Sequence, residues 1–382
     1  MIKAFCQCTE RMYSSTAALA APKVPKVIVL GATSHIAGGV VLEALRRGCD
    51  VTGTSRRPDF KGLKPSTNLD LVVIPKDKVT DVATWKKFAA GVIKSGDDVL
   101  VVNAMGGAHP EEGLTLEDLN IHPVVAALEG IQTVAKIKGV ERFHFLQFSS
   151  ASTEVCADPY GDTKRKANKT ILEMGPADTT ILSVGYALSA PVRDGGKLLI
   201  SNEHDYSPDQ LAYMPLQIIL GDGNVPIQPV ALSDIAEVAC NSLDYRGKET
   251  IFAVGPEIVT QTDLVKFFCT LMGRDFNPID LPLDVATLIV KHFAKGHFAP
   301  YAVEAVSKGG IILPHGPFEA RKGSSLLKLK DIYPVREGDE FVTVAPPIKA
   351  HLREVVRKIA TDPGAARDSL LAIVRYLKYH AK

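Results

Sequence analysis

Two serines, a tyrosine and a lysine near the middle of the chain have the residue types and spacing that proton transfer requires. Ser149 and Ser150 end a short apolar run, and Tyr160 and Lys164 follow them at positions i and i+4. That spacing puts a phenol and an ammonium on one face of a helix, where the ammonium favours the phenolate. Tyr160 could then exchange a proton with a substrate while Lys164 holds a nicotinamide ribose. The pattern predicts Ser150, Tyr160 and Lys164 as the catalytic set, with Ser149 as the alternative serine.

A glycine-containing turn near the N-terminus has the residue types that hold phosphate. Residues 31–38 read Gly-Ala-Thr-Ser-His-Ile-Ala-Gly, between an apolar run and a helical pattern. Gly31 permits a tight turn, Ala37 permits close helix packing, and Ser34 stands where a second glycine is usual. Free N–H groups at the start of the helix would bind a pyrophosphate. The predicted cofactor-binding residues of this turn are Gly31, Thr33, Ser34, His35 and Ile36.

The end of the next apolar run indicates which dinucleotide would bind. Enzymes that use NAD place an acidic residue there for the adenosine ribose, whereas this chain has Ser55, Arg56 and Arg57. Adjacent guanidinium groups can clamp a 2′-phosphate and stack on adenine, so we expect NADP(H) as the cofactor. Further cofactor contacts are predicted from residues that follow the later strands: Asp77, Asn103 and Ala104.

These residues need a scaffold that brings the ends of separate strands together. Short β-branched runs alternate with stretches of helical spacing, which predicts an α/β fold with a Rossmann-type, doubly wound parallel sheet. In such a sheet the motifs that follow the strands become neighbours at one edge. The expected strands are 26–30, 51–54, 69–74, 99–102, 143–148 and 180–184. The expected intervening helices include 81–93, 119–138 and one that begins at Asp158-Pro159.

The pattern is weaker beyond residue 190. Late strands of the same domain are expected at 226–232 and 251–254, with helices at 233–243 and 260–272. A terminal helix is expected from Asp362-Pro363. We therefore predict a dinucleotide-binding domain over residues 26–270. A smaller, mixed C-terminal region over residues 271–382 would line the substrate or dock on a partner.

Composition excludes several classes of protein. Lys and Arg total 44 against 43 Asp and Glu, a net charge of +1, which gives no electrostatic drive toward nucleic acid. No apolar run is long enough for a transmembrane helix. The 6 cysteines lack zinc spacing, and His292 and His297 do not share a helix face, so no metal site is expected.

The first residues have the composition of a targeting segment. Residues 1–25 contain Lys3, Arg11, several hydroxyl residues and an alanine run, with Glu10 as the single acid. A basic, hydroxylated and acid-poor N-terminus is typical of transit peptides. We therefore expect residues 1–25 to direct the chain to the mitochondrion, with the plastid as the alternative.

Several of these motifs together resemble the short-chain dehydrogenase/reductase superfamily, in its extended or atypical branch. The resemblance covers about residues 26–270 and includes GATSHIAG, the Ser-Arg-Arg segment and YGDTK. Residues 226–236 are similar to a Pro-Val-x-Val-x-Asp-Val-Ala stretch of epimerase-like members, and residues 252–263 match their later pattern. The sequence departs from the branch at Ser34 and Ala37, and at Ser183-Val184-Gly185 where many relatives have Arg-Pro-Gly.

With its targeting segment, the chain resembles the Rossmann-type NADPH-binding accessory subunits of mitochondrial respiratory complex I. That resemblance implies a tightly held NADPH with a structural or assembly role. It also implies a large inner-membrane complex as the partner, bound from the matrix side. The alternative is an active NADPH-dependent oxidoreductase or epimerase-like enzyme, for example in quinone or isoprenoid-related metabolism. The catalytic set favours the enzyme, whereas the targeting segment and the altered glycines favour the accessory subunit.

Overall fold

A seven-stranded parallel sheet forms the centre of the molecule. The structure is a computed structural model that describes residues 24–59, 63–107, 113–154, 157–194, 197–200, 212, 217–281, 283 and 307–343. The strand order is β13-β6-β5-β4-β1-β2-β3, and each neighbouring pair is parallel. The strands are β1 (Lys26–Leu30), β2 (Asp50–Ser55), β3 (Leu69–Val73), β4 (Asp98–Asn103), β5 (Arg142–Ser150), β6 (Asp178–Val184) and β13 (Lys248–Ala253). The predicted doubly wound α/β sheet is therefore confirmed.

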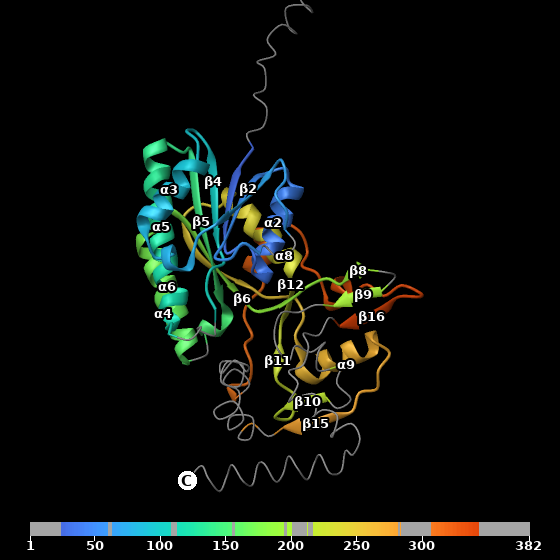
Figure 1. The fold of residues 1–382 in the computed structure, drawn as a ribbon. Helices are drawn as coiled ribbons and strands as arrows, with labels where there is room; N and C mark the ends of the chain where they lie inside the picture. The colour runs from blue at the N-terminus through green and yellow to red at the C-terminus, as the bar shows by residue number, and fades with distance from the viewer. Residues whose placement is uncertain are drawn as a thin grey trace, which may run out of the picture.

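Helices cover both faces of this sheet (Figure 1). Val27 and Val29 of β1 pack in the core beneath two helices of one face. Ile28 and Leu30 alternate with them and pack beneath three helices of the other face. Burial on both sides explains why β1 reads as a continuous apolar run. The helices of the first face are α2 (His35–Arg46) and α8 (Leu232–Asn241), and those of the second are α3 (Val82–Val92), α5 (His122–Lys138) and α6 (Pro159–Met174).

The helix predicted over residues 119–138 is two helices in the structure. A short helix, α4 (Leu116–Asn120), precedes α5, and Ile121 separates them with φ −116° and ψ −63°. Pro123 lies in the first turn of α5 and has no N–H to continue the hydrogen bonding of α4. The prediction of one continuous helix was therefore wrong at its start.

A second group of elements, named here the small lobe, has its own apolar core. Leu198, Leu264, Phe268 and Tyr333 are buried together there. Figure 1 shows the strands of this lobe apart from the seven-stranded sheet. Residues on both sides of the predicted boundary at 270 contribute to it. Its elements are the sheet of β8 (Val192–Asp194), β9 (Lys197–Ile200) and β16 (Glu340–Thr343), the pair β10 (Gln217–Leu220) and β15 (Pro278–Leu281), and the helix α9 (Gln261–Leu271).

The strand predicted over residues 226–232 lies outside the seven-stranded sheet. It is divided into β11 (Pro226–Ile227) and β12 (Pro229–Ala231). β11 pairs with β14 (Val259–Thr260), and β12 pairs in parallel with β7 (Tyr186–Leu188). The two prolines have no N–H for a ladder, which disfavours a place inside a central sheet. The other late strand is confirmed as β13, which extends the sheet beside β6.

Residues 313–332, named here the strap, return from the small lobe to the larger lobe that holds the seven-stranded sheet. The strap contains α12 (Gly316–Lys322) and α13 (Leu329–Ile332), and α12 packs on α8 and β13. Lys322 Nζ lies 2.8 Å from Asp234 Oδ1 of α8, with both side chains buried. The N–H of Leu327 donates to the other carboxylate oxygen at 2.8 Å. The strap is therefore bonded to the helix layer of the main sheet.

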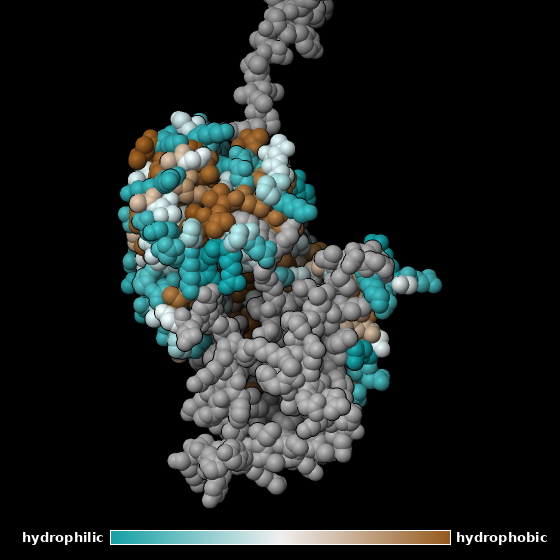
Figure 2. Space-filling view, in the orientation of Figure 1, coloured by the Kyte–Doolittle hydropathy of each residue, from teal (hydrophilic) through white to brown (hydrophobic). Residues whose placement is uncertain are grey.

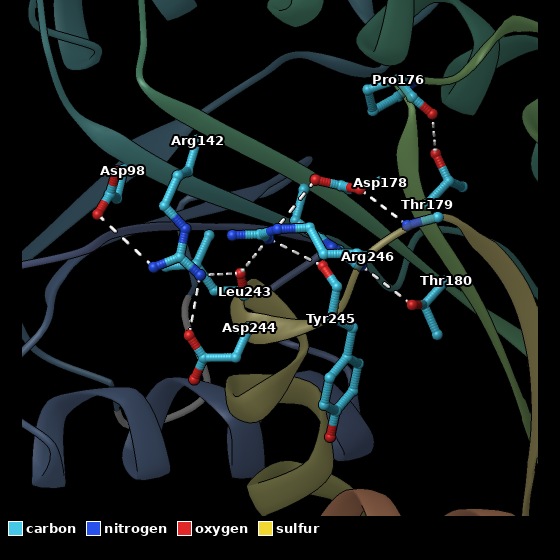
Figure 3. A network of polar contacts seen from close by, with 12 residues as sticks. Asp98, Arg142, Pro176, Asp178, Thr179, Thr180, Leu243, Asp244, Tyr245 and Arg246 are labelled. Carbon is cyan, nitrogen blue, oxygen red and sulfur yellow. Dashed lines mark hydrogen bonds and ion pairs between the residues drawn. The ribbon is translucent and has the colours of Figure 1, made fainter.

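Charged side chains join the amino ends of the central strands, opposite the predicted site (Figure 3). Arg142, at the start of β5, donates to Asp244 at 2.8 Å and lies 3.9 Å from Asp98 at the start of β4. Arg246 lies 3.5 Å from Asp178 at the start of β6. These pairs tie three strands to η3 (Ser242–Asp244) and the turn before β13. The amino edge of the sheet is thus fixed, which leaves the carboxyl edge for ligands.

His144 lies buried on β5 close to this network. Its Nε2 is 3.0 Å from Thr180 Oγ1, and its ring meets Tyr245 edge to face. Burial lowers the pKa of His144 to about 4, and the nearby Asp178 carboxylate opposes that shift. The imidazole is therefore neutral at pH 7.

The described surface is mixed in character. Figure 2 shows hydrophilic residues over much of the larger lobe and one area where hydrophobic residues gather.

Within the described ranges, no helix could span a membrane and no group of three metal-ligating side chains occurs. The predicted targeting segment up to residue 23, the terminal helix from Asp362, and His292 and His297 lie outside the described residues.

Candidate functional site

The predicted site residues follow strands that are neighbours in the sheet. The turn at Gly31 follows β1, Arg56 follows β2, Ala104 follows β4 and Ser150 ends β5. Since β2, β1, β4 and β5 are adjacent and parallel, these positions share the carboxyl edge. Ligands of open α/β sheets bind at that edge, where the strand order reverses beside β1. The sheet thus brings together residues that the sequence separates.

Gly31 occupies a conformation and a space that a larger residue would disturb. Its φ is +77°, and a Cβ built there would lie 3.2 Å from the carbonyl carbon and oxygen of Ala104. Its N–H donates to Thr54 Oγ1 at 3.3 Å, and Ala32 N–H donates to the Thr54 carbonyl at 2.8 Å. The turn therefore packs against the ends of β2 and β4, as a close-approach glycine of a nucleotide turn requires.

Ser34 is the N-cap of α2 and explains how the turn dispenses with a second glycine. Its φ of −73° is accessible to any residue, and its Oγ accepts a hydrogen bond from Ala37 N–H at 3.3 Å. The serine hydroxyl thus satisfies one amide of the first turn. Thr33, His35 and Ile36 lie half-buried beside it. The amides at this end of α2 are where a pyrophosphate would bind.

The arginine pair lies exposed beyond the end of β2. Ser55 is buried, and its Oγ accepts a hydrogen bond from Arg57 N–H at 3.1 Å, which fixes the turn at its start. Asp77 is exposed in η1 (Lys76–Lys78) after β3, with its carboxylate 3.8 Å from Lys78 Nζ. The two guanidinium groups and Asp77 therefore follow neighbouring strands at the side of the sheet where an adenosine would lie.

The segment after β4 is held by two amide side chains, Asn103, which the sequence identified, and Asn120, which it did not. Asn103 is buried, and its Nδ2 donates to Gln147 Oε1 at 2.6 Å, so this amide is used within the sheet. Asn120 of α4 donates to the Gly107 carbonyl at 3.0 Å and accepts from Gly107 N–H at 3.1 Å. A Cβ at Gly106 would lie 2.6 Å from Asn120 Oδ1. No sequence motif marks Asn120, whose role depends on the fold.

Ser150 and Ser149 face different partners at the end of β5. Ser150 is half-buried, and its Oγ lies 2.8 Å from Ser152 Oγ. Ser149 is buried, and its Oγ accepts a hydrogen bond from Asn168 of α6 at 2.8 Å. Arg165 of α6 donates to the Thr153 carbonyl at 2.6 Å and so ties the turn after Ser150 to α6. The geometry supports Ser150 over Ser149 as the serine that a substrate could reach.

Lys164 is a buried cation beside Tyr160. α6 begins where predicted, because Asp158 Oδ1 accepts from Gly161 N–H at 2.7 Å ahead of both residues. Lys164 Nζ lies 5.9 Å from the centre of the Tyr160 ring, and the lysine is only 5% exposed. Among the described residues it has neither a hydrogen bond nor an ion pair. Burial alone lowers its pKa to about 8, so the ammonium is largely retained at pH 7.

These positions form a site with a phosphate-binding end and a proton-transfer end. The turn at Gly31 and the start of α2 supply N–H donors, whereas Ser150 and Tyr160 supply hydroxyls and Lys164 supplies a buried charge. Gly106, in the segment after β4, lies against the proton-transfer end, because a Cβ there would lie 3.0 Å from Lys164 Nζ. A ligand with an anionic middle and a hydroxyl-bearing ring fits this arrangement of donors.

No protein-family model matches the sequence, and no curated protein matches it. Solved structures do match. The UDP-glucose 4-epimerase of Thermotoga maritima, solved with UDP-glucose, is 15% identical with a TM-score of 0.58, over 80% of this chain and 95% of that one. The Bordetella bronchiseptica enzyme WbmG, solved with NAD, is 13% identical with a TM-score of 0.59, over 82% and 93% of the two chains.

A third match is MoeE5, solved with UDP-glucuronic acid and NAD. It is 16% identical with a TM-score of 0.56, over 80% of this chain and 95% of that one. At sequence identities this low, structural similarity shows a shared fold and does not show a shared activity. The chain accordingly has the α/β architecture of these epimerase-like structures, a Rossmann-type sheet followed by a smaller region.

Proposed function

We propose that this protein is an NADP(H)-dependent oxidoreductase of the extended short-chain dehydrogenase/reductase type. The observation that carries the proposal is the buried ammonium of Lys164 beside Tyr160, with no other partner among the described side chains. A buried charge without a partner is costly, so the fold is expected to retain it for a ligand. The hydroxyls of a nicotinamide ribose would supply the missing acceptors.

The residues present fit such a dinucleotide along its whole length. Gly31 lets the turn pack closely against Ala104, and the start of α2 presents amides to a pyrophosphate. Arg56 and Arg57 are placed to bind a 2′-phosphate at the adenosine end. MoeE5 and WbmG were solved with NAD, so a nicotinamide cofactor agrees with the fold, and the preference for NADP(H) is our proposal for this chain.

Tyr160, Lys164 and Ser150 then divide the chemistry. When bound, the nicotinamide supplies or accepts the hydride. Tyr160 donates a proton to the substrate oxygen or removes one from it, and the charge of Lys164 favours the phenolate form. Ser150 hydrogen-bonds the same oxygen and keeps it in line with Tyr160. The nucleotide sugars named with the neighbours make UDP-glucose and UDP-glucuronic acid the first substrates to assay.

The neighbours favour this enzyme over the accessory subunit of complex I that the sequence favoured. The structures named above include a UDP-glucose 4-epimerase, and the chain keeps Ser150, Tyr160 and Lys164 at one edge of its sheet. A mitochondrial NADPH-holding subunit remains the second proposal, supported by the composition of residues 1–25. Migration of the endogenous protein in native gels would separate them, since the second proposal requires a very large complex.

Two substitutions on α6 test the proposal. Lys164→Met keeps the volume of the side chain and should lose NADPH, measured by quenching of NADPH fluorescence. Tyr160→Phe should keep NADPH and lose turnover. Lys166→Met is the matched control, because Lys166 is exposed on the same helix and pairs with Glu117 at 2.8 Å. Undiminished NADPH binding by Lys164→Met would refute the proposal, and cellular rescue by Tyr160→Phe would favour the subunit.

A further inference from the structure

One hydrogen bond joins the phosphate turn to the segment that enters the small lobe. His35 is the first residue of α2, and its Nε2 lies 2.6 Å from Ser189 Oγ. The two residues are 154 positions apart, and both are half-buried. A bond this short between distant segments places the imidazole firmly at the end of α2 where a pyrophosphate would bind.

Ser189 stands at a junction between the two parts of the molecule. It follows β7, which pairs with β12, and β12 leads directly into α8 of the main fold. After Ser189 the chain enters the hairpin of β8 and β9, and β9 pairs with β16 of the small lobe. The hydrogen bond between His35 and Ser189 therefore lies where the chain passes from β7 into the small lobe.

We propose that Ser189 is a positioning residue for His35, and that their hydrogen bond is a latch between dinucleotide binding and the β8–β9 hairpin. The proposal rests on the dinucleotide site proposed above. A serine hydroxyl can accept from Nε2 or donate to it, so Ser189 fixes the imidazole in either tautomer. The fixed ring presents its edge to the phosphates at the start of α2.

Such a latch couples dinucleotide binding at α2 to the position of the β8–β9 hairpin by thermodynamic linkage. A dinucleotide that contacts His35 in its fixed orientation binds the latched state more tightly than the unlatched state. Binding then favours the latched junction, and a latched junction raises the affinity for the dinucleotide by the same factor. The site would in this way bind its cofactor and order the entrance to the small lobe in one step.

A double-mutant cycle on the full-length protein tests the coupling, with NADPH affinity read from its fluorescence. Ser189→Ala should weaken NADPH about fivefold, the effect of one ordinary hydrogen bond. Ser189→Thr keeps the hydroxyl and should recover most of that loss. In a His35→Phe background, Ser189→Ala should have a clearly smaller effect on NADPH affinity, because the shared bond is already gone. Equal losses in both backgrounds would overturn the proposal.

Hydrogen exchange gives the readout that a purely structural bond would not change. NADPH should slow amide exchange in β9 (Lys197–Ile200) of the wild-type protein, and this protection should disappear in Ser189→Ala at saturating NADPH. Protection that persists in Ser189→Ala would overturn the latch while leaving the dinucleotide site intact. A wild-type protein that binds neither NADPH nor NADH would instead refute the proposed function, and the latch with it.

Discussion

Replacing Lys322 with methionine should destabilise the whole fold around the seven-stranded sheet and not only the strap. Lys322 Nζ lies 2.8 Å from Asp234 Oδ1, and the two side chains are 7% and 2% exposed. Methionine keeps most of the lysine volume, so the main change is a buried carboxylate without its counter-charge. Removing one partner of a buried pair costs about 3–5 kcal/mol, and a loss of that size in the free energy of unfolding is expected for Lys322→Met.

The single tryptophan gives an assay remote from the perturbation. Trp85 of α3 is fully buried on the face of the sheet opposite α8, and its Nε1 donates to the Val79 carbonyl at 2.8 Å. Urea unfolding followed by Trp85 fluorescence therefore reports the main sheet and not the strap. Lys330→Met is the matched control, because Lys330 is exposed in the same strap and should leave the midpoint unchanged.

A second variant separates the charge from the packing. Adding Asp234→Asn to Lys322→Met removes the buried charge and keeps an oxygen for the Leu327 N–H, so it should recover much of the lost stability. The reasoning would fail if Lys322→Met left the Trp85 transition in place while proteases cut the strap more readily. That result would make residues 313–332 a peripheral cover and not part of the fold.

Three further predictions concern the cofactor and pH. Arg56→Asp with Arg57→Ala should weaken NADPH by about 2–4 kcal/mol and NADH far less, by fluorescence titration, and equal losses would exclude the pair as the phosphate clamp. Gly31→Val should abolish nucleotide retention because of its φ of +77°, whereas Gly38→Ala, with open space around it, should not. The pKa of His144 is about 4 in the folded protein and 6.5 in the unfolded chain. Above pH 6.5 the ring is neutral in both states, so burying it there carries no protonation penalty to the free energy of unfolding. About 3 kcal/mol should be lost as the pH falls toward 4, by urea unfolding, and His144→Gln should lack that loss.

The sequence predicted the secondary-structure elements and the parallel sheet, because these follow from patterns within short stretches of the chain. The β-branched runs, the Asp158 cap and the alternation of strands and helices fix the elements and the parallel sheet. Once the sheet is known, Gly31, Ser150 and Lys164 must lie at one edge. The break at Ile121 was missed, although Pro123 beside it carried the signal, and the strand predicted over 226–232 proved to be two short strands that contain prolines.

Contacts between distant segments were beyond the reach of the sequence pattern. Asn120 can bond Gly107 only because α4 lies against the segment after β4, and the sequence pattern gave no sign that the predicted cofactor contact Asn103 also donates its amide to Gln147. The Lys322 and Asp234 pair joins positions that no motif links. In each case the residue type is ordinary, and only the tertiary fold shows what it bonds.

The enzyme proposal depends more on Lys164 than on the glycine turn. Ser34 and Ala37 depart from the usual glycines, yet Ser34 caps α2 and Ala37 is buried against the sheet, so both substitutions suit the local structure with or without a ligand. A lysine that is 5% exposed, with a pKa lowered to about 8, has no such local explanation. Because burying an ammonium opposes folding, a residue kept only for structure would be better as methionine or leucine. The charge at position 164 therefore argues for a ligand that folding alone does not require.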